Sequence, residues 1–265
     1  MLPLVISADS FVDHLNDPDL LIIDLSSREN YLSGHLPGAI HVSAGNLVSG
    51  IKPAVGKLPD KQRLDALFSA IGYSKDKQIV TYDDEGGGWA GRFIWTLDVI
   101  GHKKSTYING GLTTWLAHGL PLSTDQPNIT PTTTDIQIDR KYIAEMADVI
   151  DSIDDESTVI WDARSEAEYA GTRVVSARSG HVPGAINLDW LDTMDHQNNL
   201  QMLGNLQDLL DSKGITKDKQ VITHCQSHHR SGLTYLIGKK LGYNIRAYHG
   251  SWSEYGNDPD SPIEV

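Results

Sequence analysis

The stretch GYSKDKQIVTYD (residues 72–83) returns as GITKDKQVITHC (residues 214–225), 142 residues further along the chain and without a gap. A second pair of similar segments has a slightly different offset, since GHLPGAIHV (34–42) reappears as GHVPGAINL (180–188). Solenoid repeats are only about 20–50 residues long, so self-similarity over a much longer period indicates copies of a whole domain. The sequence therefore predicts two similar domains in tandem.

A segment of different composition separates the two copies. STDQPNITPTTTD (123–135) is rich in Thr, Pro and Asp and poor in apolar residues, which is typical of a linker. We therefore expect a first domain over residues 1–122, a linker over 123–135 and a second domain over 136–265. The total of 265 residues fits two domains of roughly 100–150 residues each.

The bulk composition limits the class of protein and its partners. A hydrophobic fraction of 39% with 22% charged residues is ordinary for a globular protein with a real core. The net charge of -13 argues against binding to nucleic acid or to an anionic membrane, since both reward clustered Lys and Arg. Any anionic substrate must then be attracted locally.

The amino-terminal residues and the cysteine count bear on the compartment. MLPLVISADS lacks the basic and long apolar regions of a signal peptide, and no segment approaches the ~20 apolar residues that span a bilayer. A chain with one cysteine cannot form an intramolecular disulfide, which fits a reducing compartment. We expect a cytoplasmic protein.

Each copy alternates short apolar runs with helical patterns. The runs LLIID (20–24) and QIVTY (78–82) have strand length, and TVIWD (158–162) and QVITH (220–224) repeat them. Apolar residues at helical spacing precede Gly72 in the first copy and Gly214 in the second. This alternation predicts an α/β fold in which each domain has a mainly parallel sheet with helices on both faces. Ligands of such sheets gather at the carboxyl ends of the strands.

The copies disagree at the one residue that could act as a nucleophile. The constant offset sets Cys225 opposite Asp83, and the strand that ends at His224 runs into the loop CQSHHR (225–230). A helix is expected from about Ser231, which places the thiol near backbone N–H groups that lack intrahelical partners. Such donors attract anions, so the pKa of the thiol should fall below its ordinary value of about 8.5.

These features together resemble the rhodanese family, the thiosulfate sulfurtransferases. The resemblance rests on two tandem α/β copies, a GHxPGA stretch in each, Asp83 opposite Cys225, and a six-residue loop closed by Arg230, and it extends from about Leu4 to Ile263. The family's first domain is catalytically silent, which fits Asp83. CQSHHR is similar to a bacterial loop, Cys-Gln-Thr-His-His-Arg, that uses thiosulfate, with Ser227 in place of Thr. A Gly-Ser-Gly version tends to mark 3-mercaptopyruvate enzymes instead.

The resemblance implies a mechanism and a set of site residues. Cys225 would take a sulfur from thiosulfate as a persulfide, without a cofactor or metal, and pass it to cyanide, to a thiol or to a protein sulfur acceptor. Asp162 and Arg164, in a strand-end motif, would support the site from behind, although a purely structural role stays open. Substrate binding falls to the loop and to a tryptophan at the pocket entrance: Gln226, Ser227, His228, His229, Arg230 and Trp190.

Several alternatives remain open at this stage. Cys225 could be an ordinary buried thiol, or could bind zinc with His224, His228 and His229, although no distant second pair of ligands is evident. The two loop histidines could move protons, but sulfur transfer from thiosulfate needs little proton movement. Cysteine phosphatases use five residues between Cys and Arg, whereas four intervene here. A 3-mercaptopyruvate sulfurtransferase and a persulfide carrier without turnover are the other candidate functions.

Overall fold

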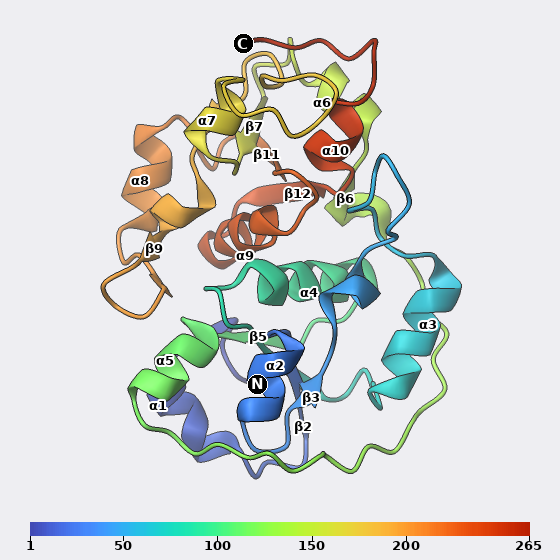
Figure 1. Ribbon diagram of the computed structural model, residues 1–265, viewed down its shortest axis with the longest axis vertical. Helices are drawn as coiled ribbons and strands as arrows, with labels where there is room; N and C mark the ends of the chain where they lie inside the picture. Colours follow the sequence, from blue (N-terminus) through green and yellow to red (C-terminus); the bar gives the residue numbers. More distant parts are fainter.

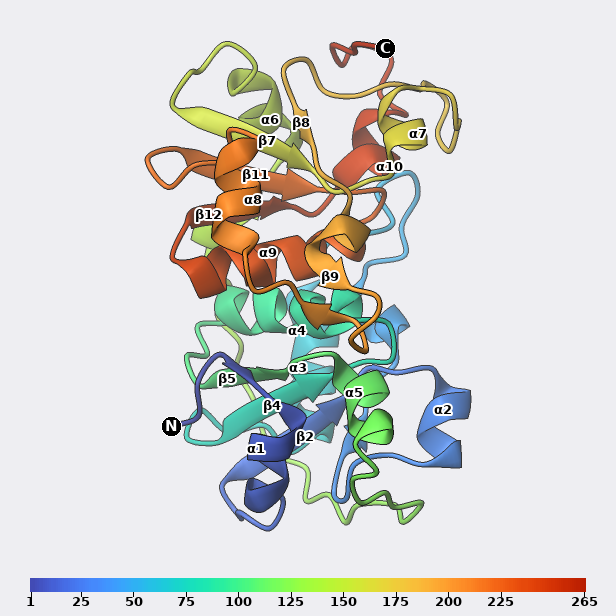
Figure 2. The same cartoon turned by 90° about the vertical axis from the view of Figure 1, so that its left-hand side faces the viewer.

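The computed structural model describes residues 1–265 and contains two units, each built on a five-stranded sheet whose neighbouring strands are all parallel (Figures 1 and 2). The strand order is β1-β5-β4-β2-β3 in the first unit and β6-β12-β11-β7-β8 in the second, so the two sheets have the same topology. The first sheet consists of β1 (Val5–Ile6), β2 (Leu20–Asp24), β3 (Ile40–His41), β4 (Gln78–Tyr82) and β5 (Ser105–Ile108). The second consists of β6 (Ile143–Ala144), β7 (Thr158–Asp162), β8 (Ile186–Asn187), β11 (Gln220–His224) and β12 (Asn244–Tyr248).

Helices cover both faces of each sheet, as the alternating pattern predicted. In the first unit one face of the sheet carries two helices that share one core cluster, and the opposite face carries two helices that share another. These are α3 (Lys61–Ala70) and α4 (Gly88–Val99), then α1 (Ala8–Phe11) and α5 (Gly111–Ala117), with α2 (Arg28–Ser33) and the 3-10 turns η1 (Val12–His14) and η2 (Ala44–Leu47). The second unit contains α6 (Met146–Asp151), α7 (Glu166–Tyr169), α8 (Leu206–Ser212), α9 (Arg230–Leu241) and α10 (Ser251–Tyr255), with η3 (Arg140–Tyr142), η4 (Trp190–Thr193) and an antiparallel pair, β9 (Met194–Asp195) and β10 (Gln201–Met202).

The predicted strands and helix ends are confirmed. The four apolar runs form β2, β4, β7 and β11 at the predicted residues, because a strand buried on both faces needs a continuous apolar run. Helix α3 stops before Gly72, whose φ of 71° suits a residue without a side chain. Helix α9 begins at Arg230, one residue before the predicted start, and ends at Gly242 with a φ of 81°.

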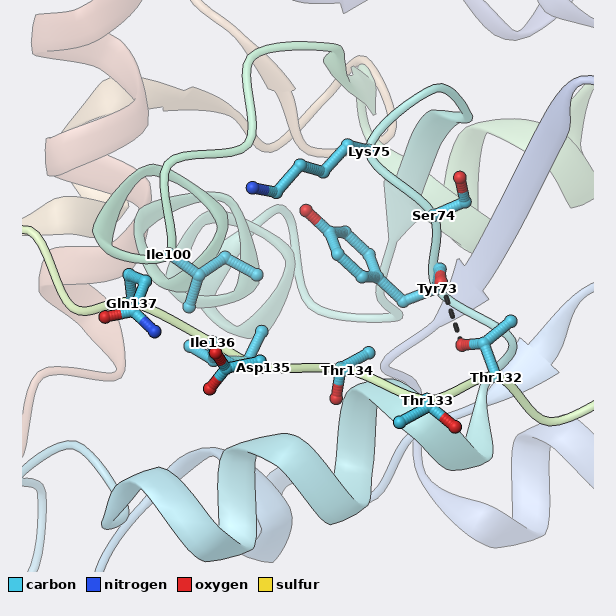
Figure 3. Close-up of a pocket in the computed structure, with 10 residues that line it drawn as sticks. All are labelled: Tyr73, Ser74, Lys75, Ile100, Thr132, Thr133, Thr134, Asp135, Ile136 and Gln137. Carbon is cyan, nitrogen blue, oxygen red and sulfur yellow. Dashed lines mark hydrogen bonds between the residues drawn. The ribbon is translucent and has the colours of Figure 1, made fainter.

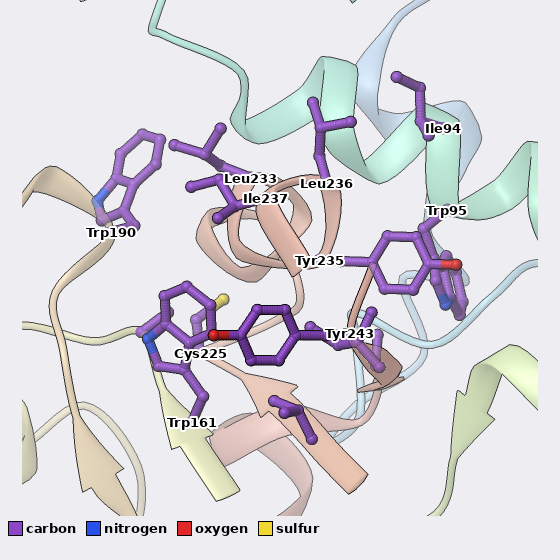
Figure 4. Close-up of a cluster of buried hydrophobic side chains, with 14 of the residues drawn as sticks. Ile94, Trp95, Trp161, Trp190, Cys225, Leu233, Tyr235, Leu236, Ile237 and Tyr243 are labelled. Carbon is purple, nitrogen blue, oxygen red and sulfur yellow. The ribbon is translucent and has the colours of Figure 1, made fainter. Parts of the chain in front are cut away.

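Helices α4 and α9 pack against each other in the middle of the molecule and join the two units (Figures 1 and 2). Their closest approach depends on glycine: a Cβ on Gly91 would lie 2.3 Å from the carbonyl oxygen of Gly232, which is backbone and cannot move aside. Side chains of both units then merge into one cluster of 25 buried residues that also includes Cys225 (Figure 4). Helix α9 of the second unit is therefore held against the first unit.

The segment between the copies is fastened to the first unit. Thr132 donates a hydrogen bond to the carbonyl oxygen of Tyr73 at 2.9 Å, and Ile136 is buried in that unit's core (Figure 3). A cavity of about 450 Å³ lies between this segment and Tyr73, Lys75 and Ile100, away from the loop that holds Cys225 (Figure 3). No helix is long and apolar enough to cross a bilayer.

Candidate active site

The loop that holds Cys225 lies at the carboxyl end of β11, the central strand of the second sheet. Its backbone is tied to the start of α10, because the carbonyl oxygens of Cys225 and Gln226 accept hydrogen bonds from the N–H groups of Trp252 (2.9 Å) and Ser253 (2.8 Å). His228 has a φ of 55°, a left-handed conformation that bends the loop tightly before α9 begins. The loop is thus fixed at both ends.

Five consecutive backbone N–H groups, those of residues 226–230, donate to no other protein group, and the N–H of Ser231 faces the Cys225 sulfur. They curve around the start of α9, where the helix dipole adds partial positive charge. A run of free amides in a tight loop is a binding site for an anion. The Ser231 hydroxyl donates toward the Cys225 sulfur at 3.5 Å, so that sulfur lies within the same arrangement.

In the equivalent loop of the first unit, the carboxyl side chain of Asp83 faces the loop amides. The carboxylate of Asp83 accepts hydrogen bonds from the N–H groups of Glu85 (3.2 Å), Gly87 (2.8 Å) and Ala90 (3.0 Å). Asp83 is the residue opposite Cys225, so this loop shows where its amides point. These N–H groups act to lower the pKa of Asp83, but burial and the charge of Glu85 outweigh them and raise it to about 6, so the loop amides favour a negative charge that the rest of this unit disfavours.

The environment of Cys225 favours the thiolate although the residue is only 1% exposed. Burial alone would raise the pKa of the thiol, but the charge of Arg230, the hydroxyl and N–H of Ser231 and the nearby His229 together lower this pKa below its ordinary value. A buried thiol among neutral groups would show the opposite shift.

Arg230 spans from the loop to α7. Its guanidinium donates two hydrogen bonds to Glu168, at 2.6 and 2.9 Å, and Glu168 also accepts from Ser165 in a capping box. Burial would raise the pKa of Glu168, but Arg230 and Ser165 lower it to about 2. The sequence assigned Arg230 to substrate binding, and these bonds show that it also braces the loop against α7.

His229 is held by the first unit. Its Nε2 bonds to the carboxylate of Glu85, and its ring stacks on Trp89 with centroids 4.4 Å apart. Trp190, expected at the pocket entrance, lies edge-on to the same ring at 5.5 Å. Burial disfavours the charged imidazole, but Glu85 outweighs it and raises the pKa of His229. Sequence reasoning missed Glu85 and Trp89, although both lie in or beside the silent copy of the loop.

The remaining loop residues contact other parts of the protein. Gln226 donates to the Ser176 hydroxyl at 3.2 Å, and the backbone of Ser227 lies against Gly56 of the first unit. His228 is fully buried, with Nδ1 2.7 Å from the Ser231 hydroxyl and its ring edge-on to Trp95.

Asp162 and Arg164 form a buried ion pair, 2.5 Å between Oδ2 and Nη2, at the end of β7. Arg164 also donates to the carbonyl oxygen of Gly180 and covers the ring of Trp252 at 4.1 Å. His224 lies 3.7 Å from Asp162. The pair therefore connects the strand end to α10, which holds the loop. No group of three or more His, Cys, Asp or Glu side chains is arranged to bind a metal ion.

Fold and loop define a two-domain enzyme with a single reactive cysteine. The model of the rhodanese-like domain matches residues 7–118 and again residues 145–258, so the chain belongs to the rhodanese family. Curated relatives named thiosulfate sulfurtransferase are 46% identical in Pseudomonas aeruginosa and 44% identical in Azotobacter vinelandii, each over all of this chain and 98% of the relative.

More distant proteins share the fold over nearly the full length. A 3-mercaptopyruvate sulfurtransferase of Escherichia coli is 26% identical over 98% of this chain and 97% of its own. The crystal structure of an anaerobic ergothioneine biosynthesis enzyme from Chlorobium limicola superposes with a TM-score of 0.87 at 20% identity, covering 99% of this chain and 70% of that one. At that identity the likeness concerns the fold alone.

Proposed function

We propose that this protein is a thiosulfate sulfurtransferase that carries the transferred sulfur as a persulfide on Cys225. One observation supports this proposal most strongly: the only thiol of the chain lies in a loop with five free backbone N–H groups, in the position where the first unit has a carboxylate. The identity of 46% to a thiosulfate sulfurtransferase, against 26% to a 3-mercaptopyruvate enzyme, favours thiosulfate as donor.

The reaction proceeds in two balanced steps. The Cys225 thiolate attacks the outer sulfur of thiosulfate, a new S–S bond forms, and the old S–S bond breaks with its electron pair leaving on sulfite. Cyanide or a thiolate then attacks the outer sulfur of the persulfide, and the pair of the broken bond returns to Cys225. The free amides stabilise the thiolate and the persulfide anion because they are already oriented before charge develops there.

The side chains of the site take different parts in this proposal. Arg230 attracts the anionic donor while its bonds to Glu168 keep the loop in place. Gln226, Ser227 and His228 contribute through their backbone N–H groups, and the ring of His228 packs the loop on the first unit. Asp162 and Arg164 support the strand end. Trp190 and His229 line the approach to the sulfur.

We also propose different roles for the two units and a compartment for the protein. Residues 1–122 form a silent unit, 123–135 connect, and 136–265 carry the chemistry without a cofactor or metal. A small-molecule sulfur donor enters, and a small thiol, cyanide or a protein thiol accepts. We place the protein in the cytoplasm, where its single cysteine stays reduced.

Steady-state assays separate this function from its rivals. With cyanide as acceptor, we expect sulfite release from thiosulfate to exceed sulfur transfer from 3-mercaptopyruvate, and Cys225→Ser to abolish both. A preference for 3-mercaptopyruvate would overturn the choice of donor. Loading of a persulfide without multiple turnovers would identify a carrier instead.

A further inference from the structure

Arg92 is a buried cation in the silent unit that no acid neutralises. The residue lies on α4 and is 0% exposed. Its guanidinium donates to the carbonyl oxygens of Leu47 at 2.7 Å and of His228 at 3.4 Å, covers the ring of Trp95 at 4.5 Å, and leaves Nε without a partner. A buried charge without a counter-ion is costly, so an anion close to this guanidinium would stabilise it.

The other cations of the site each face a carboxylate. Arg230 is bonded to Glu168, and His229 is bonded to Glu85. Arg164 is paired with Asp162 in the same way. Arg230 and His229 lower the pKa of Cys225, but the acid that each one faces offsets part of its charge.

A short path of contacts joins Arg92 to the reactive sulfur. Arg92 donates to the backbone of His228, the His228 ring contacts the Ser231 hydroxyl at 2.7 Å, and that hydroxyl donates toward Cys225 at 3.5 Å. The backbone of Arg92 also lies against Gly232, at the crossing of α4 and α9. The anion nearest to this cation along the path is the thiolate, or the persulfide that replaces it.

The neutral histidines around Arg92 leave it as the local source of charge. His228 from the loop and His249 from the turn after β12 are both buried, and burial lowers the pKa of each below its ordinary value. Burial also lowers the pKa of Arg92, to about 9, while the neighbouring Cys225 acts to raise it. The guanidinium is therefore still charged at neutral pH.

We infer that Arg92 of the catalytically silent unit is a further counter-ion of the Cys225 thiolate and persulfide, added to Arg230 and His229, which makes it a positioning residue for sulfur transfer contributed across the interface. The inference deepens the proposed function, since it concerns the same sulfur. It also gives the silent unit a part in the chemistry, because a single isolated copy would lack this charge.

The test measures the pKa of Cys225 directly. Because Cys225 is the only cysteine, the rate of alkylation by iodoacetamide between about pH 5 and pH 10 reports its thiolate alone. Arg92→Met should raise this pKa by about one unit, which makes alkylation ~10-fold slower at pH values below the wild-type pKa of the thiol. Arg92→Lys, which keeps the charge, should stay near the wild-type value. Sulfite release from thiosulfate should fall in Arg92→Met in parallel.

A matched control separates charge from interface packing. Lys239 of α9 bonds to Asp98 of α4 at 2.7 Å across the same interface, so Lys239→Met disturbs the interface without touching the loop. A folded Arg92→Met with the wild-type thiol pKa, or an equal shift in Lys239→Met, would overturn the inference. Should Arg92→Met be insoluble, Arg92→Gln, which can still donate to the Leu47 carbonyl, gives the same readout. Alkylation needs no sulfur donor, so a wild type without thiosulfate turnover would count against the proposed function alone.

Discussion

Replacement of Glu168 by Gln tests how firmly the catalytic loop is braced. Glu168 is buried, with 4% of its side chain exposed, and it accepts two hydrogen bonds from Arg230. Its pKa falls from 4.5 to about 2 in the folded protein, a difference that corresponds to about 3 kcal/mol of stability. Removal of one partner of a buried ion pair in other proteins destabilises them by about 3–5 kcal/mol, which agrees with the value from the pKa.

The sign of the pH dependence follows from the direction of that shift. A carboxyl with a depressed folded pKa stabilises the protein fully above its unfolded pKa, and this contribution disappears as the pH falls from about 4.5 toward about 2. Glu168→Gln should therefore lower the free energy of unfolding by about 3 kcal/mol at neutral pH, and the gap to wild type should close in acid.

Urea unfolding followed by tryptophan fluorescence, at several pH values between neutral and about pH 3, measures this gap. Glu166→Gln is the matched control, because Glu166 is an exposed acid on the same helix without a hydrogen-bonded partner. Equal stability of wild type and Glu168→Gln at neutral pH would refute the bracing role of Arg230. A gap that stays constant into acid would show that the lost contact is not ionic.

Two further substitutions probe the contribution of the first unit to the loop. In Gly56→Ala the new Cβ would lie 2.2 Å from the carbonyl oxygen of Ser227 and displace the loop, so we expect kcat/KM to fall at least ~10-fold. The control Gly45→Ala, whose new Cβ has its nearest neighbour at 3.8 Å, should keep wild-type activity. Equal activities of the two variants would disprove the contact. Glu85→Gln should lower the pKa of His229, which Glu85 raises, and NMR titration of that imidazole would show it. A raised histidine pKa stabilises the fold below about pH 6.5, and this contribution disappears as the pH rises through the folded pKa. Glu85→Gln should therefore lose stability mainly on the acid side. An unchanged pKa of His229 in this variant would contradict the pairing.

The strands and the position of Cys225 were predictable because local pattern determines them. A continuous apolar run is required wherever a parallel strand is buried on both faces, and the internal repeat identified the one position, 83 against 225, where scaffold and chemistry separate. The end of α9 followed from Gly242 for the same local reason.

The contribution of the silent unit was not predictable from local pattern. Glu85 meets His229 across 144 residues of sequence and Arg92 meets His228 across 136, and no periodicity signals such contacts. The left-handed backbone of His228 and the full burial of its side chain also could not be predicted from the sequence. Tertiary packing of α4 on α9 determines these features.

Intact-mass measurement after treatment with thiosulfate tests most directly whether Cys225 carries the sulfur. The wild type should gain the mass of one sulfur atom, located by peptide mapping to the segment with Cys225, release one equivalent of sulfite, and lose the gain on addition of cyanide. Folded wild-type protein that gains no sulfur, or a Cys225→Ser variant that gains it equally, would contradict a persulfide at this residue.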